Sequence, residues 1–378
     1  MDKCSRILIL TASFGEGHLL AAFALMEHFK QMGVEHVEVI DLMKEAHPFI
    51  NMISSALYKG SFKAANYGFN YYGWSYYLTQ RVTSKNGILA GLNRLGASYL
   101  QKLIAEKRPD VILNTFPYGA APIVGSHQGI PTYTIITDYL MHARWLHPCT
   151  DKYYVATNDL KQDIMKVGVQ GDHIAVTGIP IRKAFESKKQ ITTTHASHKM
   201  ILLFAGSHSV FQETEDMIRK LQGIKGCKVH VVCGRNAKLQ HYLEGQFRND
   251  TKVTIYGFVE KINELMAQAS GIITKAGGLT MAETMALQIP VFIFRPFPGQ
   301  EKDNANYLAN KGVAVIANDI NELTNQIEYL MNNGSYAKQI KEQMAILHQS
   351  KAADAIVRDV LSRAYRQSSV VPLESGLA

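Results

Sequence analysis

The segment from Lys275 to Asn306 constrains the fold more than any other part of the chain. Just before it, residues 271–274 (GIIT) are apolar and β-branched, which is typical of a buried parallel strand. The chain then passes through Gly277-Gly278 into residues 279–287, which favour a helix. Such a unit leaves backbone N–H groups unpaired at the carboxyl end of the strand, where the helix dipole adds positive charge. The segment therefore predicts an α/β fold with a phosphate site.

Polar side chains beside this turn suit the rest of a nucleotide sugar. The Thr280 hydroxyl can bind the same phosphate, and Glu283 follows one helical turn later on the same face, where it can accept hydrogen bonds from a ribose. A second loop offers amides and a carboxylate, the groups that bind sugar hydroxyls. The candidate residues of this loop are Gly299, Gln300, Glu301 and Asn304. Together these residues predict a nucleotide-sugar site, although Gly277-Gly278 alone is better explained as an ordinary turn.

The runs K-x-G-G-x-T-x-x-E, starting at Lys275, and P-G-Q-E-x-x-N-A-x, starting at Pro298, resemble the donor-binding segment of a known group of enzymes. These are the bacterial processive diacylglycerol glucosyltransferases and the plant monogalactosyldiacylglycerol synthases. The resemblance is looser to the N-acetylglucosaminyltransferase that completes the lipid-linked peptidoglycan precursor. It implies the GT-B fold, in which two Rossmann-like α/β domains face each other across a cleft.

The length of 378 residues suits two domains, each with its own core. We predict an acceptor- and membrane-binding domain at 1–186, a linker at 187–198, a UDP-sugar domain at 199–350 and a tail at 367–378. The resemblance implies that a helix at 352–366 packs back on the first domain. We find no signal peptide or membrane-spanning window, and the four cysteines have no metal-ligand spacing. These features predict a protein of the cytoplasm.

A glycine-rich turn follows the first expected strand, residues 6–11. Gly15 and Gly17 fit the dinucleotide motif G-x-G-x-x-G, and Asp41 after the second strand can mimic its ribose-binding acid. Leu20 occupies the third glycine position, which argues against a nicotinamide enzyme. The turn instead resembles the G-x-G-H loop of the lipid glycosyltransferases, where the histidine faces the cleft. The resemblance makes His18 a candidate general base and Gly17 an acceptor contact, unless His18 only hydrogen-bonds the loop.

Basic charge gathers in one part of the chain. Residues 47–108 hold eight Lys or Arg and one acid, against a formal net charge of +8 for the whole chain. Nine aromatic residues lie between Tyr58 and Tyr77 in the same region. Aromatic rings beside lysines suit the anionic surface of a membrane, and we expect the lipid acceptor there. The residues chosen for this role are Tyr58, Lys59, Phe62, Lys63 and Trp74. An aromatic core under a solvated rim is the alternative, and no nucleic-acid module is recognisable.

A further expected strand, residues 132–137, ends at Asp138, at the edge where open α/β sheets bind ligands. The pattern T-D-(x)3-H-x-x-W-x-H resembles the acceptor side of the same enzymes and marks His142, Trp145 and His147. Trp145 is equally compatible with core packing, and the histidine spacing matches no zinc template.

The resemblance adds further donor residues. Arg182, in the run T-G-I-P-I-R, corresponds to an arginine that approaches the donor diphosphate. Gly206, Ser207 and His208 form a second small-residue turn after an expected strand, which suits phosphate. Phe258 and Val259 correspond to residues that cover the uracil ring.

These features predict an inverting transferase that moves glucose from UDP-glucose to diacylglycerol, repeatedly, for membrane glycolipids and lipoteichoic-acid anchors. Either His18 or Asp138 is the base, and we expect no obligatory metal because the helix dipole and Arg182 can stabilise the departing UDP. The expected partners are the UDP-sugar, diacylglycerol and anionic lipids at the cytoplasmic face of the membrane. The alternatives are a UDP-galactose or UDP-N-acetylglucosamine donor with another lipid acceptor, and a membrane-docked nucleotide-sugar sensor without catalysis.

Overall fold

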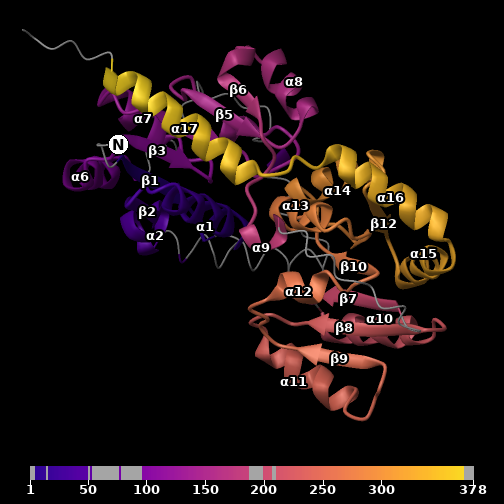
Figure 1. Cartoon of the computed structure of the whole chain (residues 1–378). Helices are drawn as coiled ribbons and strands as arrows, with labels where there is room; N and C mark the ends of the chain where they lie inside the picture. The colour runs from indigo at the N-terminus through magenta and orange to yellow at the C-terminus, as the bar shows by residue number, and fades with distance from the viewer. Residues whose placement is uncertain are drawn as a thin grey trace, which may run out of the picture. The chain divides into compact units, whose positions relative to one another are not determined.

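The computed structural model describes residues 5–13, 16–49, 52, 76–77, 96–186, 199–206 and 210–369. The chain forms two α/β units, drawn in Figure 1. The first consists of Met1–Ala56, Leu78–Arg182 and Gln349–Ala378, and the second of Leu57–Tyr77 and Lys183–His348. This division differs from the sequence-based one, because Tyr76 and Tyr77 group with the second unit and not with the first.

The first unit is built on a parallel sheet of six strands in the order β2-β1-β3-β4-β5-β6. The strands are β1 (Arg6–Thr11), β2 (His36–Asp41), β3 (Val111–Asn114), β4 (Thr132–Ile135), β5 (Lys152–Val155) and β6 (Ile174–Val176). Strands β3, β4 and β5 are buried along their whole length, and their sequences consist mostly of aliphatic, aromatic and threonine residues.

Helices cover both faces of this sheet (Figure 1). Alternate residues of β1 separate the two cores, since Ile9 faces one and Leu10 the other. The first core includes α1 (Glu16–Gln31) and α17 (Ala352–Ser369), and the second includes α2 (Leu42–Ala46), α6 (Ala97–Lys107) and α7 (Ala120–His127). Around β5 and β6 lie α8 (Asn158–Lys166) and two short 3₁₀ helices, η1 (Ala143–Trp145) and η2 (Gly171–His173).

The second unit repeats this plan with six parallel strands in the order β12-β11-β10-β7-β8-β9. The strands are β7 (Lys199–Phe204), β8 (Cys227–Val232), β9 (Val253–Tyr256), β10 (Gly271–Thr274), β11 (Val291–Phe294) and β12 (Ala314–Ala317). The helices are α9 (Lys183–Glu186), α10 (Phe211–Gln222), α11 (Ala237–Gln246), α12 (Ile262–Met266), α13 (Gly278–Ala286), α14 (Gln300–Asn310), α15 (Ile320–Asn332) and α16 (Gly334–Leu347). The α/β class predicted from the sequence is confirmed.

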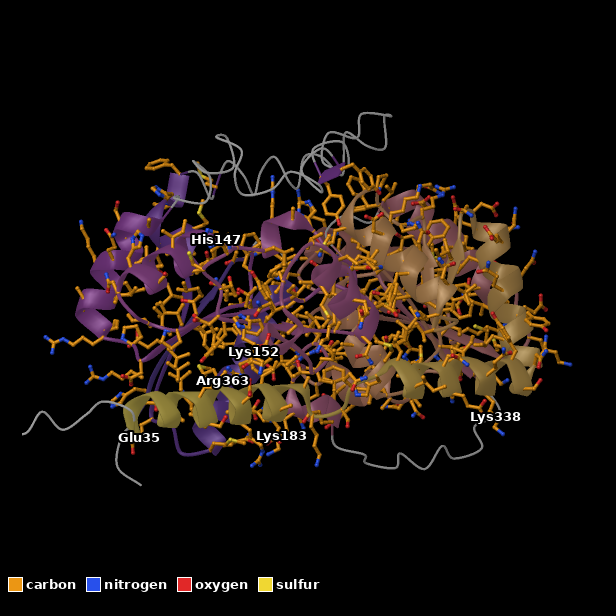
Figure 2. All side chains as sticks on the ribbon, turned by 90° about the horizontal axis from the view of Figure 1, so that it is seen from above. Glu35, His147, Lys152, Lys183, Lys338 and Arg363 are labelled. Atoms are coloured by element: carbon orange, nitrogen blue, oxygen red, sulfur yellow. The ribbon has the colours of Figure 1, made fainter. Side chains whose placement is uncertain are left out.

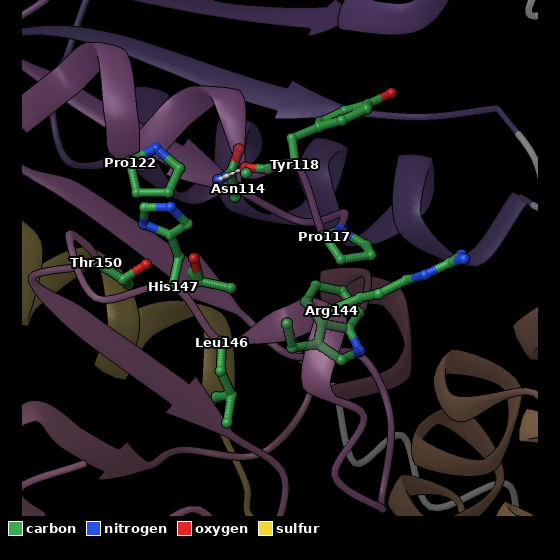
Figure 3. Close-up of a pocket in the computed structure, with 11 residues that line it drawn as sticks. Asn114, Pro117, Tyr118, Pro122, Arg144, Leu146, His147 and Thr150 are labelled. Atoms are coloured by element: carbon green, nitrogen blue, oxygen red, sulfur yellow. Dashed lines mark hydrogen bonds between the residues drawn. The ribbon is translucent and has the colours of Figure 1, made fainter. Parts of the chain in front are cut away.

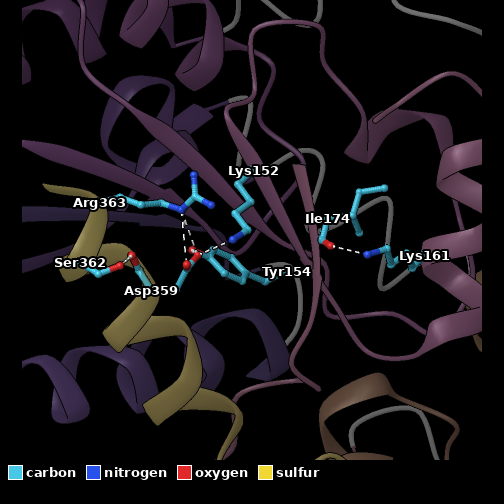
Figure 4. A network of polar contacts seen from close by, with 7 residues as sticks. All are labelled: Lys152, Tyr154, Lys161, Ile174, Asp359, Ser362 and Arg363. Atoms are coloured by element: carbon cyan, nitrogen blue, oxygen red, sulfur yellow. Dashed lines mark hydrogen bonds and ion pairs between the residues drawn. The ribbon is translucent and has the colours of Figure 1, made fainter. Parts of the chain in front are cut away.

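The last helix, α17, is fixed to the first unit by a buried charge as well as by its apolar side. The Asp359 carboxylate accepts hydrogen bonds from Lys152 Nζ and Tyr154 Oη, both at 2.7 Å (Figure 4). Arg363, one turn further along α17, places Nε 3.3 Å from the same carboxylate, and Figure 2 shows its side chain on the side of the helix that faces Lys152. The Lys152 side chain is only 8% exposed, so its charge depends on Asp359.

Replacing Asp359 tests this anchor. In Asp359→Ala, Lys152 remains buried without its carboxylate, so we expect the free energy of unfolding to fall by about 2 kcal/mol in urea titrations. The control is Asp354→Ala, which removes an exposed pair with Arg358 from the same helix and is expected to cost about 0.5 kcal/mol. Equal losses in the two variants would contradict the anchor.

The same carboxylate predicts a pH dependence. Burial alone would raise the pKa of Asp359, but the hydrogen bonds from Lys152 and Tyr154 and the charges of Lys152 and Arg363 outweigh it and lower the pKa below the ordinary 3.8. A carboxylate with a lowered pKa stabilises the fold above its ordinary pKa, and this stabilisation is lost as the pH falls through the lower value. The unfolding free energy of Asp359→Ala should therefore depend less on pH below about 4 than that of the parent protein.

Candidate active site

The strand order of the first sheet reverses between β1 and β3, and the candidate catalytic residues gather at the carboxyl ends of these strands and of β4. His18 lies in the first turn of α1, which follows β1. Thr115 directly follows β3, and Asp138 follows β4 after a short extension. Ligands of doubly wound sheets bind at such a reversal, because the connections on either side lead away to opposite faces.

Two threonines fix His18 and its imidazole. Its Nδ1 lies 2.9 Å from the Thr115 carbonyl oxygen and 2.8 Å from Thr137 Oγ1. The hydroxyl of Thr115 in turn donates to the His18 carbonyl at 3.0 Å. A carbonyl oxygen can only accept, so Nδ1 carries the proton in the neutral ring and Nε2 has the free lone pair. The arrangement selects the tautomer that can take a proton at Nε2.

The surroundings of His18 favour its neutral form. Burial lowers the pKa of His18, against the opposing effects of the Asp138 charge and the Thr115 hydrogen bond. The ring centroid lies 5.1 Å from that of Phe116, edge to face, and 6.0 Å from that of Trp145. The imidazole is therefore uncharged at neutral pH while a carboxylate nearby stabilises the charge that protonation would create.

Asp138 is 6% exposed and accepts a hydrogen bond of 3.1 Å from the indole Nε1 of Trp145. Trp145 belongs to the core cluster beside β5 and also lines the hollow described below, while its contact with an acceptor stays a prediction. Because the Asp138 carboxylate is buried and hydrogen-bonded, it can orient the indole of Trp145 and raise the pKa of His18.

A hollow beside Trp145 occupies the same end of the first sheet (Figure 3). Its lining includes Asn114, Arg144, His147 and Thr150. Asn114 is 1% exposed, and its Oδ1 has no hydrogen-bond partner among the described residues, while Nδ2 donates to the Tyr118 carbonyl at 3.4 Å. Asn114 Oδ1 is therefore a buried acceptor without a partner among the described residues at this end of the sheet.

The other predicted acceptor residues have different surroundings. His142 is buried, and its Nδ1 accepts from the Arg144 amide at the start of η1. His147 borders the hollow, and its Nδ1 accepts from the Cys149 amide at 3.2 Å. Gly17 lies in α1 next to His18. Among them, His147 alone lines the hollow.

In the second sheet the strand order reverses between β7 and β10, and a small-residue turn follows each strand. Gly206 comes after β7, and Gly277-Gly278 connects β10 to α13. The backbone of Gly277 (φ −70°, ψ 133°) is one that any residue adopts, and an added Cβ would meet only Thr280 Oγ1, at 4.0 Å. Neither strain nor packing within the chain demands glycine there, so the space beside Gly277 is open to the approach of a ligand.

Two interactions join the beginning of α14 to the connection between β10 and α13. Asn304 is 1% exposed and donates from Nδ2 to the Ala276 carbonyl at 3.3 Å. Lys275 Nζ lies 3.9 Å from Glu301 Oε2. Burial raises the pKa of Glu301, against the opposing effect of the Lys275 charge, while the Lys275 side chain is 46% exposed. Gly299 has φ 108° and ψ −146°, a conformation available essentially to glycine alone.

The remaining predicted donor residues are dispersed. Glu283 is 5% exposed on α13, three residues beyond the half-buried Thr280. Phe258 is 58% exposed after β9, and the Arg235 guanidinium lies 5.3 Å from its ring centroid, with Val259 next to it. Gln300 begins α14. Arg182 is the last residue of the first unit before the chain enters the second unit at Lys183. Its place beside the donor diphosphate stays a prediction.

Several predicted residues lie outside the described part of the chain, namely Tyr58, Lys59, Phe62, Lys63, Trp74, Ser207 and His208.

The sequence analysis also missed side chains that the structure places beside His18. Thr115 and Thr137 bind His18, and the only signal for them was their position at strand ends. Asp41, once a possible ribose ligand, instead accepts from the Ser13 and Lys44 amides at 2.9 and 3.0 Å and caps α2. No helix in the described part is long and apolar enough to cross a bilayer.

Comparisons with known proteins match both halves of the chain to enzyme families. Residues 18–181 match the family model of monogalactosyldiacylglycerol (MGDG) synthase, and residues 200–358 match that of the glycosyltransferase family 28 C-terminal domain. Processive diacylglycerol beta-glucosyltransferases of Bacillus cereus and Bacillus cytotoxicus are each 35% identical over 384 residues, which cover 99% of this chain and 98% of theirs.

Solved structures share the fold at low identity. MurG of Acinetobacter baumannii is 14% identical with a TM-score of 0.63, covering 94% of this chain and 99% of its own. The glycotransferase of kitacinnamycin is 14% identical with a TM-score of 0.67, covering 96% and 100%. The predicted GT-B fold is thus confirmed. With both halves matched and the relatives aligned over nearly their whole length, the chain belongs to the family of processive diacylglycerol beta-glucosyltransferases.

Proposed function

We propose that this protein transfers glucose from UDP-glucose to the free hydroxyl of 1,2-diacylglycerol with inversion, and extends the product by further transfers. The observation that carries the proposal is the fixed tautomer of His18, with a basic Nε2 at the carboxyl edge of the first sheet. The 35% sequence identity to the glucosyltransferases, in an alignment that covers 99% of the chain, supports glucose as the sugar and diacylglycerol as the acceptor.

The proposed reaction is one in-line displacement. The acceptor oxygen attacks the anomeric carbon from the face opposite UDP, and His18 Nε2 takes the hydroxyl proton as the new C–O bond forms. The bond between the anomeric carbon and the phosphate oxygen breaks, and UDP leaves with the electron pair. Asp138 stabilises the imidazolium that forms on His18.

The departing UDP needs stabilisation of negative charge on its β-phosphate. The N-terminus of α13 supplies N–H groups and a helix dipole without a capping side chain, and the Gly206 turn follows the neighbouring strand. We further propose that Arg182 adds a positive charge and that no metal ion is obligatory. Rates that fall in a metal chelator and recover on adding Mg²⁺ would contradict the last point.

The acceptor implies a membrane. The basic and aromatic composition of residues 47–108 supports peripheral docking on anionic lipids at the cytoplasmic face.

The direct test is UDP release from UDP-glucose, measured with and without vesicles that contain diacylglycerol and anionic lipid. We expect release to require diacylglycerol and the product to be a glucosylated lipid. Release with UDP-galactose or UDP-N-acetylglucosamine instead would correct the donor. Binding of UDP-glucose without release would overturn the transferase and favour the nucleotide-sugar sensor.

The general base can be tested by pH. His18→Ala should lower kcat by about 100- to 10,000-fold with little change in UDP-glucose affinity. Since burial lowers the pKa of His18 below the ordinary 6.5, the neutral base persists below that pH, and the acidic limb of kcat/KM should lie under 6.5.

Asp138→Asn extends this test. The Asp138 charge raises the pKa of His18, so removing the charge should move the acidic limb to still lower pH while reducing kcat. His230→Gln is the control, because burial lowers the pKa of His230 too but it lies on β8 of the other sheet. A limb that moves in the control and not in Asp138→Asn would contradict the assignment.

Gly277→Ala tests the phosphate site. An added Cβ meets nothing in the protein within 3.4 Å, so stability should change by no more than about 1 kcal/mol. The methyl group would occupy the space where a phosphate approaches, so the Kd for UDP should rise at least about tenfold in calorimetric titrations. Gly245→Ala on α11 is the matched control, since it also adds a Cβ in open space and should leave UDP affinity unchanged. Unchanged affinity in Gly277→Ala would remove this turn from the donor site.

A further inference from the structure

Tyr77 makes two hydrogen bonds to the start of α14, which lies 222 and 226 residues further along the chain at the two contacts. Its hydroxyl accepts from the Gly299 amide at 3.3 Å and donates to Asp303 Oδ1 at 3.1 Å. Tyr76 hydrogen-bonds the same carboxylate, and the two tyrosine rings pack edge to face with centroids 5.4 Å apart. All four residues belong to the second unit.

These hydrogen bonds are made to Gly299 and Asp303, on either side of the first residues of α14. Gly299 has a conformation available essentially to glycine alone, and it is the N-cap of α14. On the other side of the first turn of α14, Asn304 and Glu301 connect it to the β10–α13 connection. Tyr77 therefore completes a set of contacts that fixes the start of α14 from two sides. The first turn of α14 carries Gln300 and Glu301, whose polar groups suit sugar hydroxyls.

We propose that Tyr77 is a positioning residue that holds the Gly299–Asp303 turn in the conformation that receives the sugar of the nucleotide donor. This proposal rests on the proposed function for the nature of the ligand. It separates two parts of the donor site, because Tyr77 bonds to the start of α14 and not to the β10–α13 turn proposed for the phosphates. Loss of the Tyr77 hydroxyl should thus weaken recognition of the sugar and spare recognition of UDP.

The test compares UDP-glucose and UDP binding by calorimetry in Tyr77→Phe, which keeps the ring and removes only the hydroxyl. Because the bonds lie in a partly exposed place, with Tyr77 42% exposed, we expect the Kd and KM for UDP-glucose to rise about three- to tenfold. The Kd for UDP and the melting temperature should stay at the parent values. Tyr329→Phe is the matched control, since its exposed hydroxyl also accepts a hydrogen bond, from Asn333 Nδ2, but it lies on α15.

Asp303 supplies a second arm. Asp303→Asn keeps an oxygen that accepts from Tyr77 and should bind UDP-glucose nearly as the parent does, whereas Asp303→Ala should resemble Tyr77→Phe. The double variant Tyr77→Phe/Asp303→Ala should lose less than the product of the two single losses, because both remove one shared interaction.

Parent-like UDP-glucose affinity in Tyr77→Phe would overturn the proposal, and so would equal losses of UDP and UDP-glucose affinity. The binding measurements need no lipid acceptor. If the parent protein bound UDP-glucose but never glucosylated diacylglycerol, the proposed function would fail, and the difference between the two ligands would still decide the role of Tyr77.

Discussion

The reversal of strand order in each parallel sheet is the constraint on which the rest of this structure depends. Where two neighbouring strands send their connections to opposite faces, their carboxyl ends are left with backbone groups that no adjacent loop covers. In the first unit this happens between β1 and β3, and in the second between β7 and β10. Every residue for which we propose direct chemistry follows one of these strands or its immediate neighbour, apart from Arg182.

The two units use this edge for opposite electrostatic tasks. In the second, helix α13 starts directly from the strand end, and glycine at its N-cap leaves the positive end of the helix open to an anion. In the first unit, the helix after β1 carries His18 at the sheet edge, and the Thr115 carbonyl accepts a hydrogen bond from its protonated Nδ1. The same backbone geometry thus exposes donors in one sheet and uses an acceptor in the other, which creates a base. A transferase needs both, since it removes a proton from one substrate and stabilises negative charge on the other.

The sequence predicted the elements around both edges because short apolar runs followed by glycine have few other folded forms. The Gly277-Gly278 turn was predicted for the same reason, Asp138 from its place at a strand end, and His18 from the resemblance of its loop to the lipid glycosyltransferases. It could not predict contacts between residues far apart in the chain. Thr137 looks like any strand-end threonine until β4 lies beside β3, and Asp359 looks like a solvated helix residue until α17 covers Lys152. Tyr77 belongs to an aromatic stretch that suggested a membrane surface, yet its hydroxyl bonds to the start of α14 in the second unit.

The contacts of Tyr77 and of α17 also explain why the unit boundaries do not follow the order of the chain. Apolar residues of α17 complete the core against α1 although β7 to α16 come between them in sequence, and Asp359 adds a directional bond that apolar packing lacks. An apolar helix face alone can shift along a sheet with little change in buried area, whereas a carboxylate that must satisfy Lys152 and Tyr154 can do so in one register. Polar contacts of high sequence separation therefore specify which segment joins which unit, and the hydrophobic cores then stabilise that choice.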